Sequence, residues 1–161
     1  NGLERQMDFM VGDLLQAPSR LEPNSFDHVM ANPPYLAAGT ATLPPDAARA
    51  RAIGEGAADL AAWVGFARAM VRMRGSITFI HRADRLDALL AALSGRVGEI
   101  VIFPLWPGAG KPAKRVLVRA RRGIETPLKL SAGLVLHGTD RKFTAAAERI
   151  LREGAALSLI D

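Results

Sequence analysis

Ten consecutive residues carry more structural information than any other stretch of this chain: Phe26-Asp27-His28-Val29-Met30-Ala31-Asn32-Pro33-Pro34-Tyr35. Residues 26–31 form a short apolar run, which is typical of a buried strand. Pro33 and Pro34 can neither continue a helix nor donate to a sheet ladder, so the strand must end at Asn32. Asn32 therefore stands at the carboxyl end of a strand, where open α/β sheets bind their ligands.

The turn that follows this strand has a distinctive chemistry. Its two prolines fix the backbone and remove two N–H donors, which leaves carbonyl oxygens without a nearby amide to satisfy them. The Asn32 side-chain oxygen and the Pro33 carbonyl could together accept both hydrogens of a planar amino or amide group. The ring of Tyr35 offers a face on which a base can stack.

The rest of the chain alternates between predicted strands and predicted helices. Apolar runs predict strands at 7–15, 76–81, 97–105, 116–118 and 134–136, and helical spacing predicts helices at 59–75, 83–93 and 144–152, with Gly75 ending the first. This order favours one α/β domain over residues 1–161, with a mostly parallel sheet and helices on both faces. Residues 36–55 show no steady period and predict an active-site cover, in which Arg49 and Arg51 could meet a substrate backbone.

Composition sets the class of protein. The 161 residues are 49% hydrophobic and 23% charged, the balance of an ordinary globular domain. No cysteine is present, which excludes disulfides, thiolate zinc sites and cysteine nucleophiles. The three histidines show no metal-ligand spacing, so we expect packed or surface histidines and no metal. No spanning segment or signal peptide is evident, and we expect a cytoplasmic location.

Positive charge gathers in one part of the sequence. The chain has 21 Lys and Arg against 16 Asp and Glu, and residues 111–122 contain six of these cations and no acid. Clustered cations without carboxylates suit phosphate binding, so we predict RNA contacts from this stretch. The predicted contacts are Lys111, Lys114, Arg115 and Arg119. The alternative is the solvated face of a hairpin.

The Asn-Pro-Pro-Tyr turn after a strand resembles motif IV of the class I S-adenosylmethionine-dependent methyltransferases that modify exocyclic amino or amide nitrogen. The resemblance implies a Rossmann-like fold, S-adenosylmethionine as cofactor, and Asn32, Pro33, Pro34 and Tyr35 as catalytic residues. Val11-Gly12-Asp13-Leu14 is similar to the end of the family's third strand, which implies cofactor contacts from Asp13 and Leu14 as well as Asn32. A turn former is the other interpretation of Asp13.

The segments 111–117 and 137–144 look like those of the bacterial tRNA adenine-N6 methyltransferases related to the small-domain RNA methylases. This resemblance implies tRNA or another RNA as partner and adenine N6 as the acceptor. An N2-guanine rRNA methyltransferase and a release-factor glutamine N5-methyltransferase remain alternatives, because the same turn serves all three. An inactive RNA-binding module with this fold is the alternative from another class.

The beginning of the chain is similar to the segment that follows the second helix of the family's fold. The glycine-rich first loop and the acidic ribose ligand of the family would then precede Asn1, so we expect the C-terminal part of a methyltransferase domain. Such a part would expose a sheet edge, which a second copy of the chain is expected to cover in a homodimer.

Overall fold

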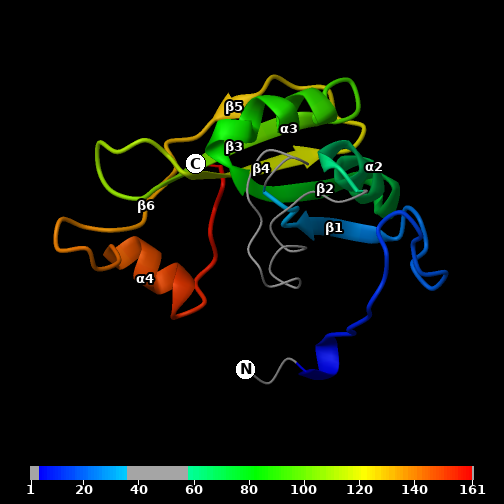
Figure 1. Ribbon diagram of the computed structural model, residues 1–161, viewed down its shortest axis with the longest axis horizontal. Coiled ribbons are helices and arrows are strands. Elements are labelled where there is room, and N and C mark those ends of the chain that lie inside the picture. Colours follow the sequence, from blue (N-terminus) through cyan, green and yellow to red (C-terminus); the bar gives the residue numbers. More distant parts are fainter. Residues whose placement is uncertain (1–3, 36–57, 161) are drawn as a thin grey trace, which may run out of the picture.

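The part of the chain that the structure describes contains one six-stranded sheet, in which the three longest strands lie at the centre. The computed structural model describes residues 4–35 and 58–160. Its strands are β1 (Phe26–Ala31), β2 (Val71–Arg82), β3 (Gly98–Trp106), β4 (Arg115–Arg121), β5 (Lys129–Leu130) and β6 (Leu134–Val135). They pair in the order β1-β2-β4-β3-β5, and β6 also pairs with β3 (Figure 1).

Strand direction confirms an α/β sheet that is mostly, but not wholly, parallel. β1 runs parallel to β2, and β5 and β6 run parallel to β3. β4 is antiparallel to both of its neighbours, β2 and β3. Among the described strands, β4 therefore points one way and the other five point the opposite way, so the sheet is mixed.

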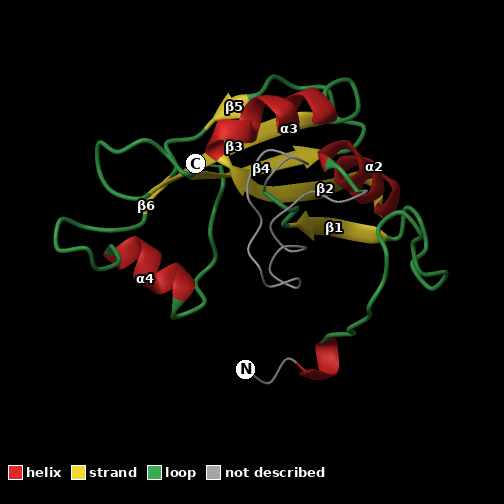
Figure 2. Ribbon diagram, viewed as in Figure 1, coloured by secondary structure: helices red, strands yellow, loops and turns green. Residues whose placement is uncertain are grey.

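The helices are α2 (Leu60–Met70), α3 (Leu86–Leu93) and α4 (Ala145–Leu151), with short 3-10 turns η1 (Glu4–Gln6) and η2 (Ala83–Arg85) (Figure 2). α2 connects β1 to β2, and α3 connects β2 to β3. Both connections step in the same direction along the sheet, and right-handed crossovers then put both helices on the same face. Among the described residues, these two core helices thus share one face, whereas the sequence predicts helices on both; α4 packs beside β6.

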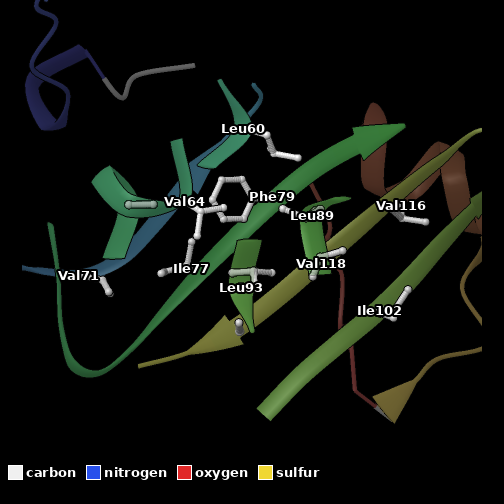
Figure 3. Packing of buried hydrophobic residues seen from close by; sticks show 12 residues of the cluster. Leu60, Val64, Val71, Ile77, Phe79, Leu89, Leu93, Ile102, Val116 and Val118 are labelled. Atoms are coloured by element: carbon white, nitrogen blue, oxygen red, sulfur yellow. The ribbon is translucent and has the colours of Figure 1, made fainter. Parts of the chain in front are cut away.

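Alternation along the strands builds the core beneath α2 and α3. Ile77 and Phe79 of β2 have no exposed surface and meet Val64 of α2 and Leu89 and Leu93 of α3 (Figure 3). β4 adds Val116, Val118 and Ala120 to the same cluster. The core is therefore a single layer between the sheet and two helices.

The helix predicted over 59–75 ends earlier than expected. Asp59 caps α2 by accepting from the Ala62 amide, and the backbone becomes extended at Val71, where β2 begins. Gly75 lies inside β2, where an added Cβ would come within 2.7 Å of the Asp27 carbonyl. The glycine is needed for close approach of β1 and β2, and it does not end a helix.

The strand predicted over residues 7–15 is wrong. This segment contains only an isolated bridge between Asp13 and Gln16, and residues 7–13 are exposed. Phe9 and Val11 are 79% and 102% exposed. An apolar run becomes a strand only when a neighbouring strand satisfies its amides, and no strand of the described part pairs with the outer edge of β1. Within the described residues, no helix is long and apolar enough to cross a membrane.

Truncation of the central aromatic side chain should destabilise the whole domain. Phe79→Ala is expected to lower the free energy of unfolding by about 3–5 kcal/mol, because it opens a cavity in a fully buried layer. Urea denaturation followed by circular dichroism measures this change. Phe26→Ala, at the 38% exposed start of β1, is the matched control and should cost far less. Equal losses would show that Phe79 is not the centre of the core.

Candidate functional site

The carboxyl edge of the sheet gathers polar groups from several elements. Asn32 follows β1, and His81 and Arg82 close β2. Arg115 begins β4, but β4 runs antiparallel, so its first residue pairs with Arg82 on one side and with Leu105 near the end of β3 on the other. The reversed direction of β4 thus delivers an arginine to the edge at which the parallel strands end.

The Asn-Pro-Pro-Tyr turn has the geometry of an exposed acceptor on a fixed base. Pro33 is fully buried, whereas Asn32 is exposed. The Tyr35 hydroxyl donates to Asn32 Oδ1 at 2.6 Å. A carbonyl oxygen has two lone pairs, so Oδ1 keeps one acceptor position while the tyrosine fixes its direction. Asn32 and Tyr35, both predicted from the sequence, therefore act as one unit.

Two further side chains hold the ring of Tyr35. The His81 ring lies 5.8 Å from it, centroid to centroid, with the two planes at 74°. The guanidinium carbon of Arg115 lies over the ring at 5.5 Å from its centroid, within cation–π range. A base that stacks on this face must displace Arg115, so the arginine stands at the position where a base would enter.

His81 is a site residue that the sequence analysis missed. It is fully buried, and its Nδ1 accepts the Arg82 amide at 2.7 Å. The sequence predicts only a packed or surface histidine, and the structure places His81 in the interior of the protein. The available signal was its place at the end of a predicted strand, but contact with Tyr35 arises only when β1 pairs with β2.

The basic stretch divides into two groups. Lys111, Lys114 and Arg115 are exposed in or beside the loop that joins β3 to β4. Arg119 instead lies within β4 and pairs with Glu99 of β3 at 3.0 Å, with both side chains about one quarter exposed. Four residues of strand separate it from Arg115 by about 13 Å. The structure therefore does not bring Arg119 together with the other predicted RNA contacts.

Arg121 and Arg122 are also occupied within the fold. Arg121 pairs with the same Glu99 at 3.2 Å and donates to the Arg74 carbonyl. Arg122 donates to the Val71 carbonyl at 2.8 Å, at the junction of α2 and β2. The lack of acidic residues within 111–122 gave no sign of these contacts, because Glu99 lies in β3 and the carbonyl groups of Val71 and Arg74 lie in β2.

Asp13 and Leu14, the predicted cofactor contacts, line a hollow of about 290 Å³ together with Trp63 and Phe66 of α2. Asp13 Oδ1 accepts the Leu15 amide at 2.9 Å, so the residue also forms the turn that the sequence allowed. Its second carboxylate oxygen has further acceptor capacity. Aromatic side chains beside one carboxylate suit a flat purine with an amino group, which fits the adenine end of S-adenosylmethionine.

An ion pair also lies at the carboxyl edge of the sheet, just after β2. Asp84 bonds to Arg82, and this contact holds the pKa of the carboxyl below its usual value. Within the described residues, no group of three or more His, Cys, Asp or Glu side chains could hold a metal ion. Arg49 and Arg51, and the cover predicted at 36–55, lie outside the described residues.

Comparison with known proteins supports the fold. No family model matches the sequence, and no curated protein matches it. Among solved structures, a predicted O-methyltransferase, protein Atu636 from Agrobacterium tumefaciens, is similar with a TM-score of 0.68 and 27% identity. The match covers 89% of this chain and 61% of that one. This chain has an α/β Rossmann-like methyltransferase fold.

The hollow beside Trp63 can be tested through fluorescence. The chain has two tryptophans, so Trp106→Phe leaves Trp63 as the only indole probe. Titration with S-adenosylmethionine should change its emission and saturate. Asp13→Ala should raise the Kd by about tenfold or more, because a hydrogen bond to a charged group is removed.

Glu22→Ala, an exposed acid of the same segment, is the matched control and should leave the titration unchanged. Emission that does not respond to the cofactor would remove the hollow from the binding site.

Proposed function

We propose that this chain is the substrate-recognising part of an S-adenosylmethionine-dependent N-methyltransferase whose acceptor is an exocyclic amine of a base in RNA, adenine N6 in tRNA being the favoured target. The observation that carries the proposal is the exposed residue Asn32 at the carboxyl edge of the sheet, whose side-chain oxygen accepts a hydrogen bond from the Tyr35 hydroxyl. The methyltransferase fold and the loop cations support it.

Amine methylation requires the nitrogen lone pair to leave its conjugation with the ring. Asn32 Oδ1, with the neighbouring Pro33 carbonyl, would accept the two amine hydrogens and draw the nitrogen toward a tetrahedral geometry. Tyr35 would keep Oδ1 fixed throughout, so little reorganisation is needed during the reaction. S-Adenosylmethionine, when bound with its adenine beside Asp13, Leu14 and Trp63, supplies an electrophilic methyl group.

The target base must leave its stack to reach this turn. The Tyr35 ring would receive it once Arg115 moves off its face, and Lys114 stands next to Arg115 in the sequence to meet a flanking phosphate. This combination of one aromatic ring and adjacent cations is typical of binding sites for single-stranded nucleic acid.

Replacement of Asn32 should disable methyl transfer while cofactor binding is retained. Asn32→Ala is expected to lower kcat by roughly 100- to 1,000-fold, because the reacting group no longer has an aligned acceptor. The assay follows label from S-adenosylmethionine into unmodified bacterial tRNA, and nucleoside mass analysis identifies the product. N6-methyladenosine supports the proposal, and a 2′-O-methyl nucleoside would contradict it.

Two variants test how the turn works. Tyr35→Phe keeps the ring and removes only the hydroxyl that directs Asn32, so kcat should fall by up to about tenfold. Met30→Ala, at an 80% exposed position of the same strand, is the control and should retain the parental rate. If Asn32→Ala weakens cofactor binding as much as it lowers kcat, the turn is structural rather than catalytic.

Charge reversal at the loop should weaken RNA binding. Lys114→Glu with Arg115→Glu is expected to raise the Kd for tRNA and to flatten its dependence on salt by roughly 0.7–0.9 in logarithmic slope for each phosphate that the protein no longer neutralises. Fluorescence anisotropy at several salt concentrations measures both quantities. The control, Arg5→Glu with Arg96→Glu, makes the same change in net charge at exposed positions elsewhere. An unchanged slope in the loop variant would remove these two residues from the RNA site.

A further inference from the structure

A cleft opens at the same edge of the sheet, beyond the site formed by Asn32, Tyr35, His81 and Arg115. We call that group of four residues the Tyr35 site. Trp106 at the end of β3 pairs with Val135 at the end of β6, so the segments that follow these strands leave the sheet side by side (Figure 1). Between residues 107–111 and residues 137–144 lies a cleft of about 890 Å³. Its polar lining includes Lys111, His137, Thr139, Arg141 and Thr144.

One wall of this cleft is a tight, internally bonded hairpin. The Gly138 amide donates to the Lys142 carbonyl at 2.9 Å, and the Lys142 amide donates to Asp140 Oδ1. The rings of His137 and Phe143 stack at 4.8 Å with their planes 19° apart. These contacts fix the hairpin that presents Arg141, whose side chain is exposed.

Lys111 forms the opposite wall. Its amide donates to the Gly108 carbonyl at 3.2 Å and closes a turn. A Cβ built on Gly108 would lie 3.4 Å from Lys111 Cδ and 3.8 Å from the His137 carbonyl oxygen. The lysine stem therefore passes over a glycine that adds no bulk, close to where the hairpin begins.

The lining of the cleft carries two cations and no carboxylate. Lys111 and Arg141 supply the charge, and the hydroxyl of Thr139 is a further donor. Asp140 belongs to the hairpin but is not part of the lining, and its Oδ1 accepts a backbone amide. An exposed, preformed and cationic cleft of this kind suits a phosphodiester group.

The position of the cleft favours RNA over a free anion as its occupant. The loop that carries Lys111 continues directly to Lys114 and Arg115 and so joins the cleft to the Tyr35 site. Arg115 and Val135 are separated by the width of two strand spacings, about 10 Å. One RNA strand could therefore lie along the loop and meet both places.

We propose that the cleft between residues 107–111 and 137–144 holds a backbone phosphate of the RNA strand flanking the target base, through Lys111 and Arg141. This inference rests on the proposed function and adds a second anchor to it. The anchor would fix the register of the RNA along the edge of the sheet, while the Asn32 turn selects the amine.

Anisotropy with unmodified tRNA and a labelled 12-nucleotide single-stranded RNA tests the proposal. Lys111→Glu with Arg141→Glu should raise the Kd for both RNAs by tenfold or more and flatten the salt slope by roughly 0.7–0.9, the value expected when one phosphate is no longer neutralised. Lys111→Arg with Arg141→Lys should bind as the parent does. Circular dichroism checks the fold, and the milder Lys111→Ala with Arg141→Ala replaces the reversal if that variant is misfolded.

The outcomes separate this inference from the proposed function. If the cleft variant binds RNA like the Arg5→Glu, Arg96→Glu control while Lys114→Glu, Arg115→Glu binds weakly, the cleft proposal is wrong and the proposed function stands. If the parental chain binds neither RNA, both fail. Inorganic phosphate or adenosine monophosphate that binds the cleft at low concentration without competing with RNA would show a small-anion site and also overturn the proposal.

Discussion

The pairing of β4 between β2 and β3 is the constraint on which the rest of the structure depends. β4 is bonded on both sides, and its buried residues Val116, Val118 and Ala120 join the core beneath the two helices. Its direction matters as much as its position. An antiparallel strand starts where its parallel neighbours end, so the loop before β4 and its first residue, Arg115, belong to the binding edge of the sheet.

The residues that face away from the core show how this pairing is stabilised. Glu99 of β3 has a positive φ of 47° and ion-pairs with Arg119 and Arg121 of β4. These side chains are partly shielded from water, where removal of one partner is more costly than at a fully exposed site. Arginines that look like an RNA-binding stretch in the sequence thus hold two strands together, and the exposed cations of that stretch are limited to the loop at the edge.

The same edge explains how binding and chemistry could be combined. A short turn after β1 directs Asn32 outward, and Tyr35, His81 and Arg115 from three elements fix its surroundings. Under the proposed function, a base that stacks on Tyr35 would find Asn32, Tyr35 and His81 already in place, and only Arg115 would have to move from the tyrosine face. Preorganisation of this kind is the main source of catalytic power in a reaction that forms no covalent enzyme intermediate.

The sequence by itself determined the local features. The double proline ended β1, helical spacing and Asp59 started α2, and the Asn-Pro-Pro-Tyr turn marked the candidate site, because each depends on neighbours within a few residues. Pairing decided what depends on residues distant in the chain: the reversal of β4, the contact of His81 with Tyr35 and the capture of Arg119 by Glu99. The apolar run at 7–15 shows the same limit, since hydrophobicity can favour a strand but only a partner strand can satisfy its backbone.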